Sequence, residues 1–138
     1  NSRRGRASAH NIVPTSTGAA KSIGLVIPSL KGKLDGIAYR VPTIDGSMID
    51  VTLELKVPVT KELINETIKN NQNDAIKYTE DPIVSSDVIG KKRGCTFDSL
   101  LTNVIEVDGK QLVKLVGWYD NEYGYTYQML CTAKKMFK

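Results

Sequence analysis

The sequence predicts an α+β fold built on a mixed, largely antiparallel sheet that helices cover on one face. Strand-like and helix-like segments are interspersed along the chain, and the tight turns Asp45-Gly46 and Asp108-Gly109 favour antiparallel hairpins. There is no G-x-G-x-x-G unit, so the chain has no dinucleotide-binding fingerprint. With 138 residues, of which 41% are hydrophobic and 25% charged, the chain is long enough to bury a core as one soluble domain.

The first predicted elements surround a run of hydroxyl-bearing and small residues. Residues 18–27 are expected to form a helix with Thr17 as its N-cap, which Pro28 ends. Residues 34–41 alternate as a strand does, which would hold Arg40 on rigid backbone.

The middle of the chain has the clearest alternation. A half-buried strand is predicted from four apolar residues that point one way between polar ones: Ile49, Val51, Leu53 and Leu55. Thr60 is positioned to cap a surface helix, and the polar run at residues 70–74 ends that helix.

The second half of the chain is expected to contain further strands and a final helix. Short strands are predicted at residues 76–79 and 84–88. A hairpin of residues 101–107 and 112–118 follows, and its second strand is apolar on both faces, which places it at the centre of the sheet. Residues 123–138 have helical periodicity and a basic end that matches the helix dipole.

Basic charge is concentrated at one end of the chain. Residues 1–34 carry six Lys and Arg residues and no acid, although the whole chain has 19 basic and 15 acidic residues. Hydroxyls and a glycine at a helix start, inside a positive field, predict a phosphate site. The alternatives are a solvated basic arm or a nucleic-acid-binding module, and the absence of any aromatic residue before Tyr39 argues against base stacking.

Thr17, Gly18 and Arg40 are the first candidate site residues. A hydroxyl and backbone N–H groups can donate to an oxyanion, and an arginine adds a bidentate charged fork. The alternative is that Thr17 only caps its helix and Arg40 pairs with an acid such as Asp50 or Glu54. The local sequence leaves both readings open.

The sequence offers no nucleophile with its base. Cys95 and Cys131 lack C-x-x-C or Cys/His spacing, and His10 is the only histidine, so we expect no metal site and no catalytic residue in this chain. No apolar run approaches the roughly 20 residues that span a bilayer, and no signal peptide is visible. A reduced, cytoplasmic setting is the expectation.

A second informative segment runs from Trp118 to Tyr125. Its polar Asp120-Asn121-Glu122 cluster lies between a buried strand and a helix start, where it can cap the helix. An amide at such a junction can instead present a donor and an acceptor together to a planar carboxamide.

These strings together resemble a known family, the catalytic domain of phosphorylating glyceraldehyde-3-phosphate dehydrogenase. The resemblance runs in order over essentially the whole chain. Its motifs are RRGR at residues 3–6, NIVPTSTGAAK at 11–21, KGKLDG at 31–36, RVP at 40–42, YTEDPIVS at 78–85 and WYDNEYGY at 118–125.

The resemblance implies how the chain would bind anions. Thr17 and Gly18 would contribute to the site for attacking inorganic phosphate, and Arg40 would bind phosphate where the substrate and inorganic phosphate sites adjoin. Arg4 would also belong to the phosphate-binding residues, in a loop that contacts the cofactor region and a neighbouring subunit of a homotetramer, near the same anions.

The resemblance also implies a cofactor contact. Asn121 would hydrogen-bond the carboxamide of NAD, with Tyr125 packed beside it; NADP is not excluded. The family oxidises a phosphorylated aldehyde through a covalent thioester, which inorganic phosphate then attacks to give 1,3-bisphosphoglycerate.

The resemblance finally implies that parts of the enzyme are missing. Residues 1–138 would be one partial catalytic domain that begins inside the cofactor and interface loop, with the dinucleotide-binding domain, the nucleophilic cysteine and the histidine base upstream. Cys95 stands where the family usually has Ser, and Gln128 where many members have Arg. The isolated chain is expected to be inactive, and an erythrose-4-phosphate dehydrogenase-like relative is the alternative enzyme.

Overall fold

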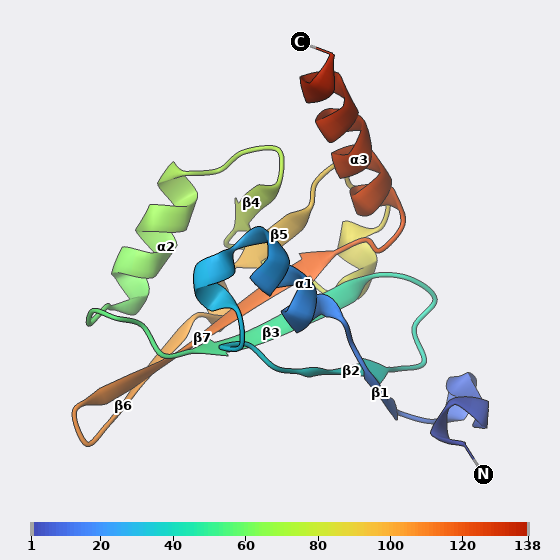
Figure 1. Ribbon diagram of the computed structural model, residues 1–138, viewed down its shortest axis with the longest axis horizontal. Coiled ribbons are helices and arrows are strands. Elements are labelled where there is room, and N and C mark those ends of the chain that lie inside the picture. The colour runs from blue at the N-terminus through green and yellow to red at the C-terminus, as the bar shows by residue number, and fades with distance from the viewer. Residues whose placement is uncertain (1, 138) are drawn as a thin grey trace. The chain divides into compact units, whose positions relative to one another are not determined.

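The computed structural model describes residues 2–137 (Figure 1). By its internal contacts the chain divides into two compact units, which meet in the sequence between Ile44 and Asp45. The predicted α+β class is confirmed, because three α-helices accompany a mixed five-stranded sheet and a separate two-stranded antiparallel sheet.

The first unit contains a two-stranded sheet and one α-helix. Its elements, in chain order, are η1 (Arg3–Gly5), η2 (Ser8–His10), β1 (Val13–Ser16), α1 (Ala19–Val26), η3 (Pro28–Leu30) and β2 (Ile37–Arg40). β1 and β2 pair antiparallel, with Val13 opposite Arg40 and Ser16 opposite Ile37. The predicted strand at residues 34–41 is therefore present in shortened form, and Arg40 does lie on rigid backbone.

The helix α1 begins one residue later than expected. Gly18 occupies the N-cap position, with φ −87° and ψ −5°, and the Thr17 hydroxyl accepts the Ala19 N–H at 3.2 Å. The prediction of Thr17 as N-cap was thus wrong by one position, because the hydroxyl bonds back to the residue two further on and leaves Gly18 at the boundary.

The second unit is organised around one long central strand. Its sheet comprises β3 (Ser47–Leu53), β4 (Ile76–Thr79), β5 (Cys95–Asp98), β6 (Asn103–Val107) and β7 (Lys110–Tyr119). The order is β3-β7-β5-β4, and β6 also pairs with β7. Among the strands of residues 2–137, only β4 and β5 run parallel to each other, so the predicted mixed, largely antiparallel sheet with a central last strand is confirmed.

One predicted strand is absent from this unit. Residues 84–88 were expected to be extended, but Ser85–Val88 forms a short 3-10 helix, η4. The Asp87 carboxylate accepts the Val84 N–H at 2.8 Å, and this local bond starts a turn where the apolar residues alone predict a strand. The hairpin strand predicted from residue 101 likewise begins only at Asn103, because Ser99–Leu101 forms the 3-10 helix η5.

The helix α2 (Lys61–Asn70) begins as predicted. The Thr60 hydroxyl accepts the Leu63 N–H at 3.1 Å, which is the expected capping bond. The apolar side of α2 faces the sheet across a small apolar cavity of about 290 Å³. Residues of α2, β3, β7 and the loop between β3 and α2 line it: Leu53, Leu55, Val59, Leu63, Ile64, Thr67, Ile68, Val113 and Leu115.

The helix α3 (Tyr123–Met136) follows directly from the end of β7 (Figure 1). Lys134 and Lys135 lie in its last turn, as the dipole argument predicts. The helix was predicted to extend to Lys138 but ends at Met136, with Phe137 as its C-cap, and Lys138 itself lies outside the described residues. Nowhere in residues 2–137 is a helix both long and apolar enough to cross a membrane.

Candidate functional site

Thr17 and Gly18 form the start of the first candidate site. Thr17 is half-buried and Gly18 is exposed. The Thr17 oxygen accepts the Ala19 N–H, so its own O–H remains available to donate. The first i→i−4 bond of the helix runs from the Ser22 N–H to the Gly18 carbonyl at 3.0 Å, which leaves the N–H groups of Ala20 and Lys21 without an acceptor in that series.

Arg40 belongs to the same row of residues. In an antiparallel ladder, directly opposed residues share a face, so Arg40 lies on the face of Val13 and Thr15. Thr17 is one position past the end of β1, where the same alternation would continue the row. Four residue steps along a strand separate the two ends of the row, a span of about 13 Å. The backbones of Arg40 and of the helix start therefore lie too far apart to be in contact.

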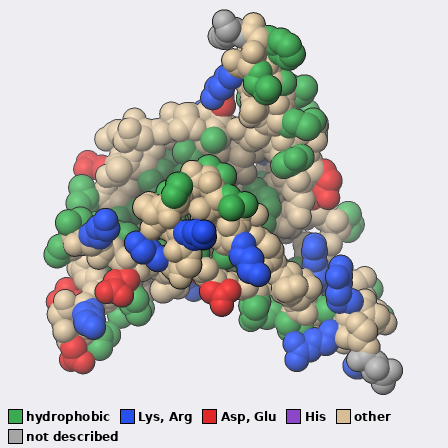
Figure 2. Space-filling view, in the orientation of Figure 1, with side chains coloured by type: hydrophobic (Ala, Val, Ile, Leu, Met, Phe, Trp, Pro, Cys, Tyr) green, Lys and Arg blue, Asp and Glu red, His purple; other side chains and the backbone are tan. Residues whose placement is uncertain are grey.

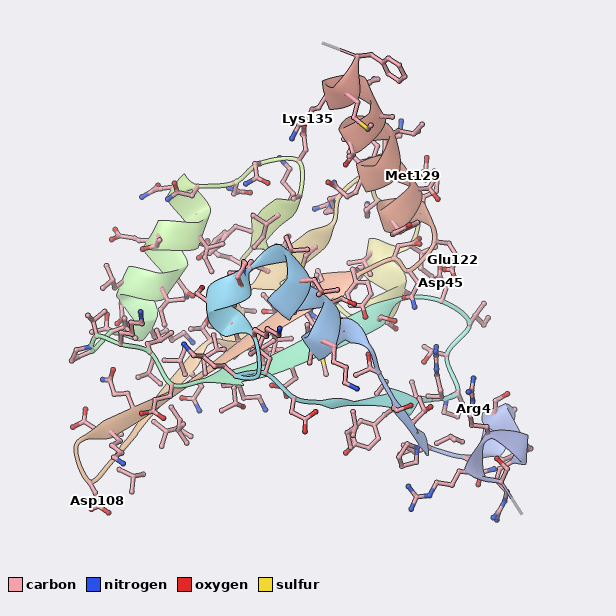
Figure 3. The ribbon with its side chains drawn as sticks, viewed as in Figure 1. Arg4, Asp45, Asp108, Glu122, Met129 and Lys135 are labelled. Carbon is pink, nitrogen blue, oxygen red and sulfur yellow. The ribbon has the colours of Figure 1, made fainter. Side chains whose placement is uncertain are left out.

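Arg4 adds to the positive charge of this unit. It is exposed in η1, which contacts β1, and Figure 3 shows it in the N-terminal turn close to where β1 begins. Residues 1–44 carry seven basic side chains and only one acid, Asp35, a net charge of +6. Figure 2 shows Lys and Arg side chains over the N-terminal turns and around α1.

The alternative role for Arg40 was an ion pair with an acid such as Asp50 or Glu54. Within the second unit, Asp50 pairs with Lys114 across β3 and β7 at 2.8 Å. The phosphate role of Arg40 stays a prediction. Thr17 does bond the start of its helix, as the alternative role for this residue predicted. It uses only the acceptor capacity of its hydroxyl for this bond.

In the second unit, Asp120 fixes the junction between β7 and α3. Its side chain is only 5% exposed, and one oxygen accepts the N–H groups of Glu122 at 2.9 Å and Tyr123 at 2.6 Å. The other oxygen accepts the Gly90 N–H at 2.8 Å. Burial by itself raises the pKa of Asp120, but these three N–H groups, together with Asp45, hold that pKa below its usual value.

Asn121 is left free by this arrangement. Its side chain is exposed, and none of the hydrogen bonds found within residues 2–137 uses its amide. Tyr125, on the first turn of α3, is 70% exposed. The sequence offered capping and carboxamide recognition as alternatives for this cluster. Asp120 supplies the bonds to the start of α3, and carboxamide recognition by Asn121 stays a prediction.

Three carboxylates lie close together at this junction. Asp45, Asp120 and Glu122 have oxygens within 4.8 Å of one another, and Figure 3 shows Asp45 and Glu122 side by side at the base of α3. Asp45 lies 75 residues before Asp120 in the numbering, and sequence reasoning did not connect them. The buried oxygens of Asp120 are already occupied by backbone donors, which gives this cluster a structural role.

The two thiols do not resemble an activated nucleophile. Burial raises the pKa of the Cys95 thiol, which lowers its thiolate fraction at neutral pH. Cys131 is half-buried on α3, and His10 is exposed in η2. Gln128, on α3, donates to the Asp74 carbonyl at 2.7 Å.

The predicted site residues thus fall into two groups. Thr17, Gly18, Arg40 and Arg4 belong to the first unit, and Asn121 and Tyr125 to the second. Within the first group the strand register places Arg40 on the face of Val13 and Thr15, and Thr17 comes one position after the end of β1. The sequence did not predict that Asp120 would bond both the start of α3 and the loop at Gly90. Its position between a predicted strand and a predicted helix start was the sequence feature that pointed to such a role.

Comparison with known proteins identifies the family. Residues 1–121 match the family described as glyceraldehyde 3-phosphate dehydrogenase, C-terminal domain. The chain is 55% identical over 136 residues to glyceraldehyde-3-phosphate dehydrogenase of Streptococcus pyogenes, covering 99% of this chain and 40% of that protein. It is 53% identical to the protein of the same name from Clostridium pasteurianum, covering 99% of this chain and 41% of that protein.

The chain therefore spans about 40% of the length of the relatives it matches. The erythrose-4-phosphate alternative is not favoured, because both relatives are named for glyceraldehyde 3-phosphate. The family match covers most of the chain and includes both groups of site residues up to Asn121. The chain belongs to the family of glyceraldehyde 3-phosphate dehydrogenase C-terminal domains.

Proposed function

We propose that this chain is the anion-binding and nicotinamide-contacting part of the catalytic domain of an NAD-dependent phosphorylating glyceraldehyde-3-phosphate dehydrogenase. The intact enzyme would oxidise glyceraldehyde 3-phosphate and phosphorylate it with inorganic phosphate to 1,3-bisphosphoglycerate. The observation that carries the proposal is the row from Thr17 to Arg40, on one face of a unit with net charge +6, in a chain of this family.

The chemistry of this row suits phosphate groups. The Thr17 O–H and the free N–H groups at the start of α1 supply directed donors, and Arg40 supplies a permanent charge with a planar fork. The span of about 13 Å between the row's ends leaves room for more than one oxyanion. Both the substrate phosphate and the attacking inorganic phosphate would be neutralised and oriented along it.

The free amide of Asn121 suits the nicotinamide carboxamide. A primary amide offers two N–H donors and one carbonyl acceptor, the complement of another primary amide. When bound, NAD supplies the acceptor for the hydride. This chain's part is to hold the carboxamide, with Tyr125 beside it, and the preference for NAD over NADP would be decided outside the chain.

The isolated chain would lack the reactive groups. It has no dinucleotide fingerprint, and the raised pKa of Cys95 disfavours a thiolate there. We infer that the nucleophilic cysteine and the histidine base lie in the part of the enzyme that precedes these residues. The intact enzyme would be a cytoplasmic homotetramer.

The test compares the 138-residue chain with the full-length enzyme that contains it. NADH formation is followed with glyceraldehyde 3-phosphate and, separately, with erythrose 4-phosphate, each with and without inorganic phosphate. We expect phosphate-dependent turnover of glyceraldehyde 3-phosphate by the full-length enzyme and none by the isolated chain. Turnover by the purified chain, or a full-length enzyme that prefers erythrose 4-phosphate, would contradict the proposal.

A further inference from the structure

The Asp120 side chain closes a small ring around Asn121. One carboxylate oxygen accepts the N–H groups of Glu122 and Tyr123, so the residue before Asn121 is bonded to the two residues after it. The other oxygen accepts the Gly90 N–H, which belongs to the loop between η4 and β5. The Asn121 backbone is therefore held both within its own turn and against a neighbouring loop.

A second contact holds the first turn of α3 to the same loop. Gly124 is buried, and a Cβ added there would lie 2.6 Å from the Arg93 carbonyl oxygen. Backbone therefore approaches backbone more closely than any larger residue would allow. Together with the Gly90 bond, this contact fixes the start of α3 at two points, one on each side of Asn121.

A rigid backbone that carries an unused amide is preorganised for a ligand. We propose that Asp120 is the positioning residue that orients Asn121 toward the nicotinamide carboxamide, with Gly124 as its second support. This inference rests on the proposed function, because it concerns the same carboxamide contact. Fixing the backbone that carries the amide before binding lowers the conformational entropy lost on binding and sharpens the choice between ligands that differ by one hydrogen bond.

The charge of Asp120 is essential to this role. The ionised carboxylate can accept on both oxygens, whereas an Asn side chain of the same shape has one acceptor and one NH₂ donor. In Asp120→Asn either the Gly90 N–H or the N–H pair of Glu122 and Tyr123 faces a donor. One half of the ring must then open.

The experiment measures recognition of the carboxamide by equilibrium binding to the full-length enzyme. Calorimetry gives the dissociation constants of NAD, of its 3-acetylpyridine analogue and of ADP-ribose. The analogue has a methyl ketone in place of the carboxamide and lacks the NH₂ donor. ADP-ribose lacks the whole nicotinamide ring. The ratio of the analogue's dissociation constant to that of NAD therefore reports on Asn121, and ADP-ribose reports on the remainder of the cofactor site.

In the parent enzyme we expect NAD to bind about tenfold more tightly than the analogue, the effect of roughly one hydrogen bond. In Asp120→Asn and in Gly124→Ala, the dissociation constants of NAD and of the analogue should differ by no more than about twofold, and the same is expected of Asn121→Ala. The dissociation constant of ADP-ribose should stay unchanged. Hydrogen exchange at the Glu122 and Tyr123 amides of the unliganded enzyme should accelerate in Asp120→Asn.

Asp98→Asn is the matched control. Asp98 is 2% exposed and also accepts on both oxygens, from the Leu100 N–H at 3.1 Å and the Trp118 indole N–H at 3.0 Å. It shares the burial and the bonding of Asp120, but its partner nearest to Asn121 is Trp118 on β7, three residues earlier, and it does not bond the turn that contains Asn121. Its substitution should lower stability and leave the binding ratio unchanged.

Two results would overturn the inference, and they differ in meaning. If Asn121→Ala brings the ratio of the two dissociation constants close to one and Asp120→Asn leaves that ratio at the parent value, the carboxamide contact stands and Asp120 has no positioning role. If Asn121→Ala itself leaves the ratio unchanged, the contact assumed in the proposed function is absent as well. Should Asp120→Asn fail to fold, Gly124→Ala decides the matter by the same ratio.

Discussion

Val13 and Arg40 lie directly opposite each other in the antiparallel ladder of β1 and β2. This pairing fixes Arg40 on the face of Val13 and Thr15, and Thr17 follows one position after the end of β1, just before α1 begins. Two short strands thereby align a charged side chain and a helix start that are 23 residues apart in the numbering.

Thr17 should act through its hydroxyl. In the full-length enzyme, Thr17→Val removes both the acceptor for the Ala19 N–H and the free O–H, at nearly constant shape. We expect the KM for inorganic phosphate to rise about tenfold, the effect of losing one hydrogen bond to a charged group. Thr17→Ser, which keeps the hydroxyl, should stay within about twofold of the parent, and a valine variant with an unchanged KM would refute the role.

Cys95 should be dispensable for catalysis. Because burial raises the pKa of its thiol, it should react slowly with iodoacetamide at neutral pH, and Cys95→Ser should retain turnover in the full-length enzyme to within about twofold. Initial rates of NADH formation provide the measurement. A complete loss of activity in a folded Cys95→Ser enzyme would show that the nucleophile had been misassigned.

The Thr60 cap should contribute measurably to stability. Thr60→Ala deletes the acceptor for the Leu63 N–H, and the free energy of unfolding in urea should fall by about 1 kcal/mol. Thr60→Ser keeps an oxygen in the same place and should differ little from the parent. Equal midpoints for the alanine and serine variants would contradict the capping assignment.

Asp120 should make stability depend on pH in the acid range. Its folded-state pKa lies below the value of about 3.9 expected in the unfolded chain, so its ionised form stabilises the fold above that pH. This stabilisation is lost as the pH falls through the folded-state pKa. The stability difference between the parent and Asp120→Asn should be constant from pH 7 to about 5 and shrink below about pH 4.

Urea unfolding at several pH values, with Asp45→Asn as a second background, checks this expectation. Asp45 and Glu122 each have a carboxylate oxygen within 4.8 Å of an Asp120 oxygen, and the Asp45→Asn background separates the influence of Asp45 from that of Asp120. A difference that grows on acidification would show the opposite sign of the pKa shift.

The parts of the fold that the sequence predicted are those with strong local signals. Thr60 caps α2, and the Asp108-Gly109 turn has positive φ at both residues, 51° and 72°. The central position of β7 followed from its apolar residues on both faces. In each case the deciding interaction is local or depends only on burial.

The parts that the sequence missed depend on partners distant in the chain. β1 is a four-residue strand that contains Pro14, which lacks an N–H and reads as a strand breaker. It forms only because β2 pairs with it. The role of Asp120 was hidden for the same reason, because its second bond is to Gly90, 30 residues earlier.

The most direct test of the central claim is the phosphate dependence of Arg40→Ala in the full-length enzyme, with Arg40→Lys as the control for charge. Loss of a charged, bidentate donor should raise the KM for inorganic phosphate by about tenfold to a hundredfold, with the dissociation constant for NAD unchanged. Arg40→Lys should fall between the alanine variant and the parent. A phosphate KM in Arg40→Ala equal to that of the parent would contradict the assignment of this row as the phosphate-binding face.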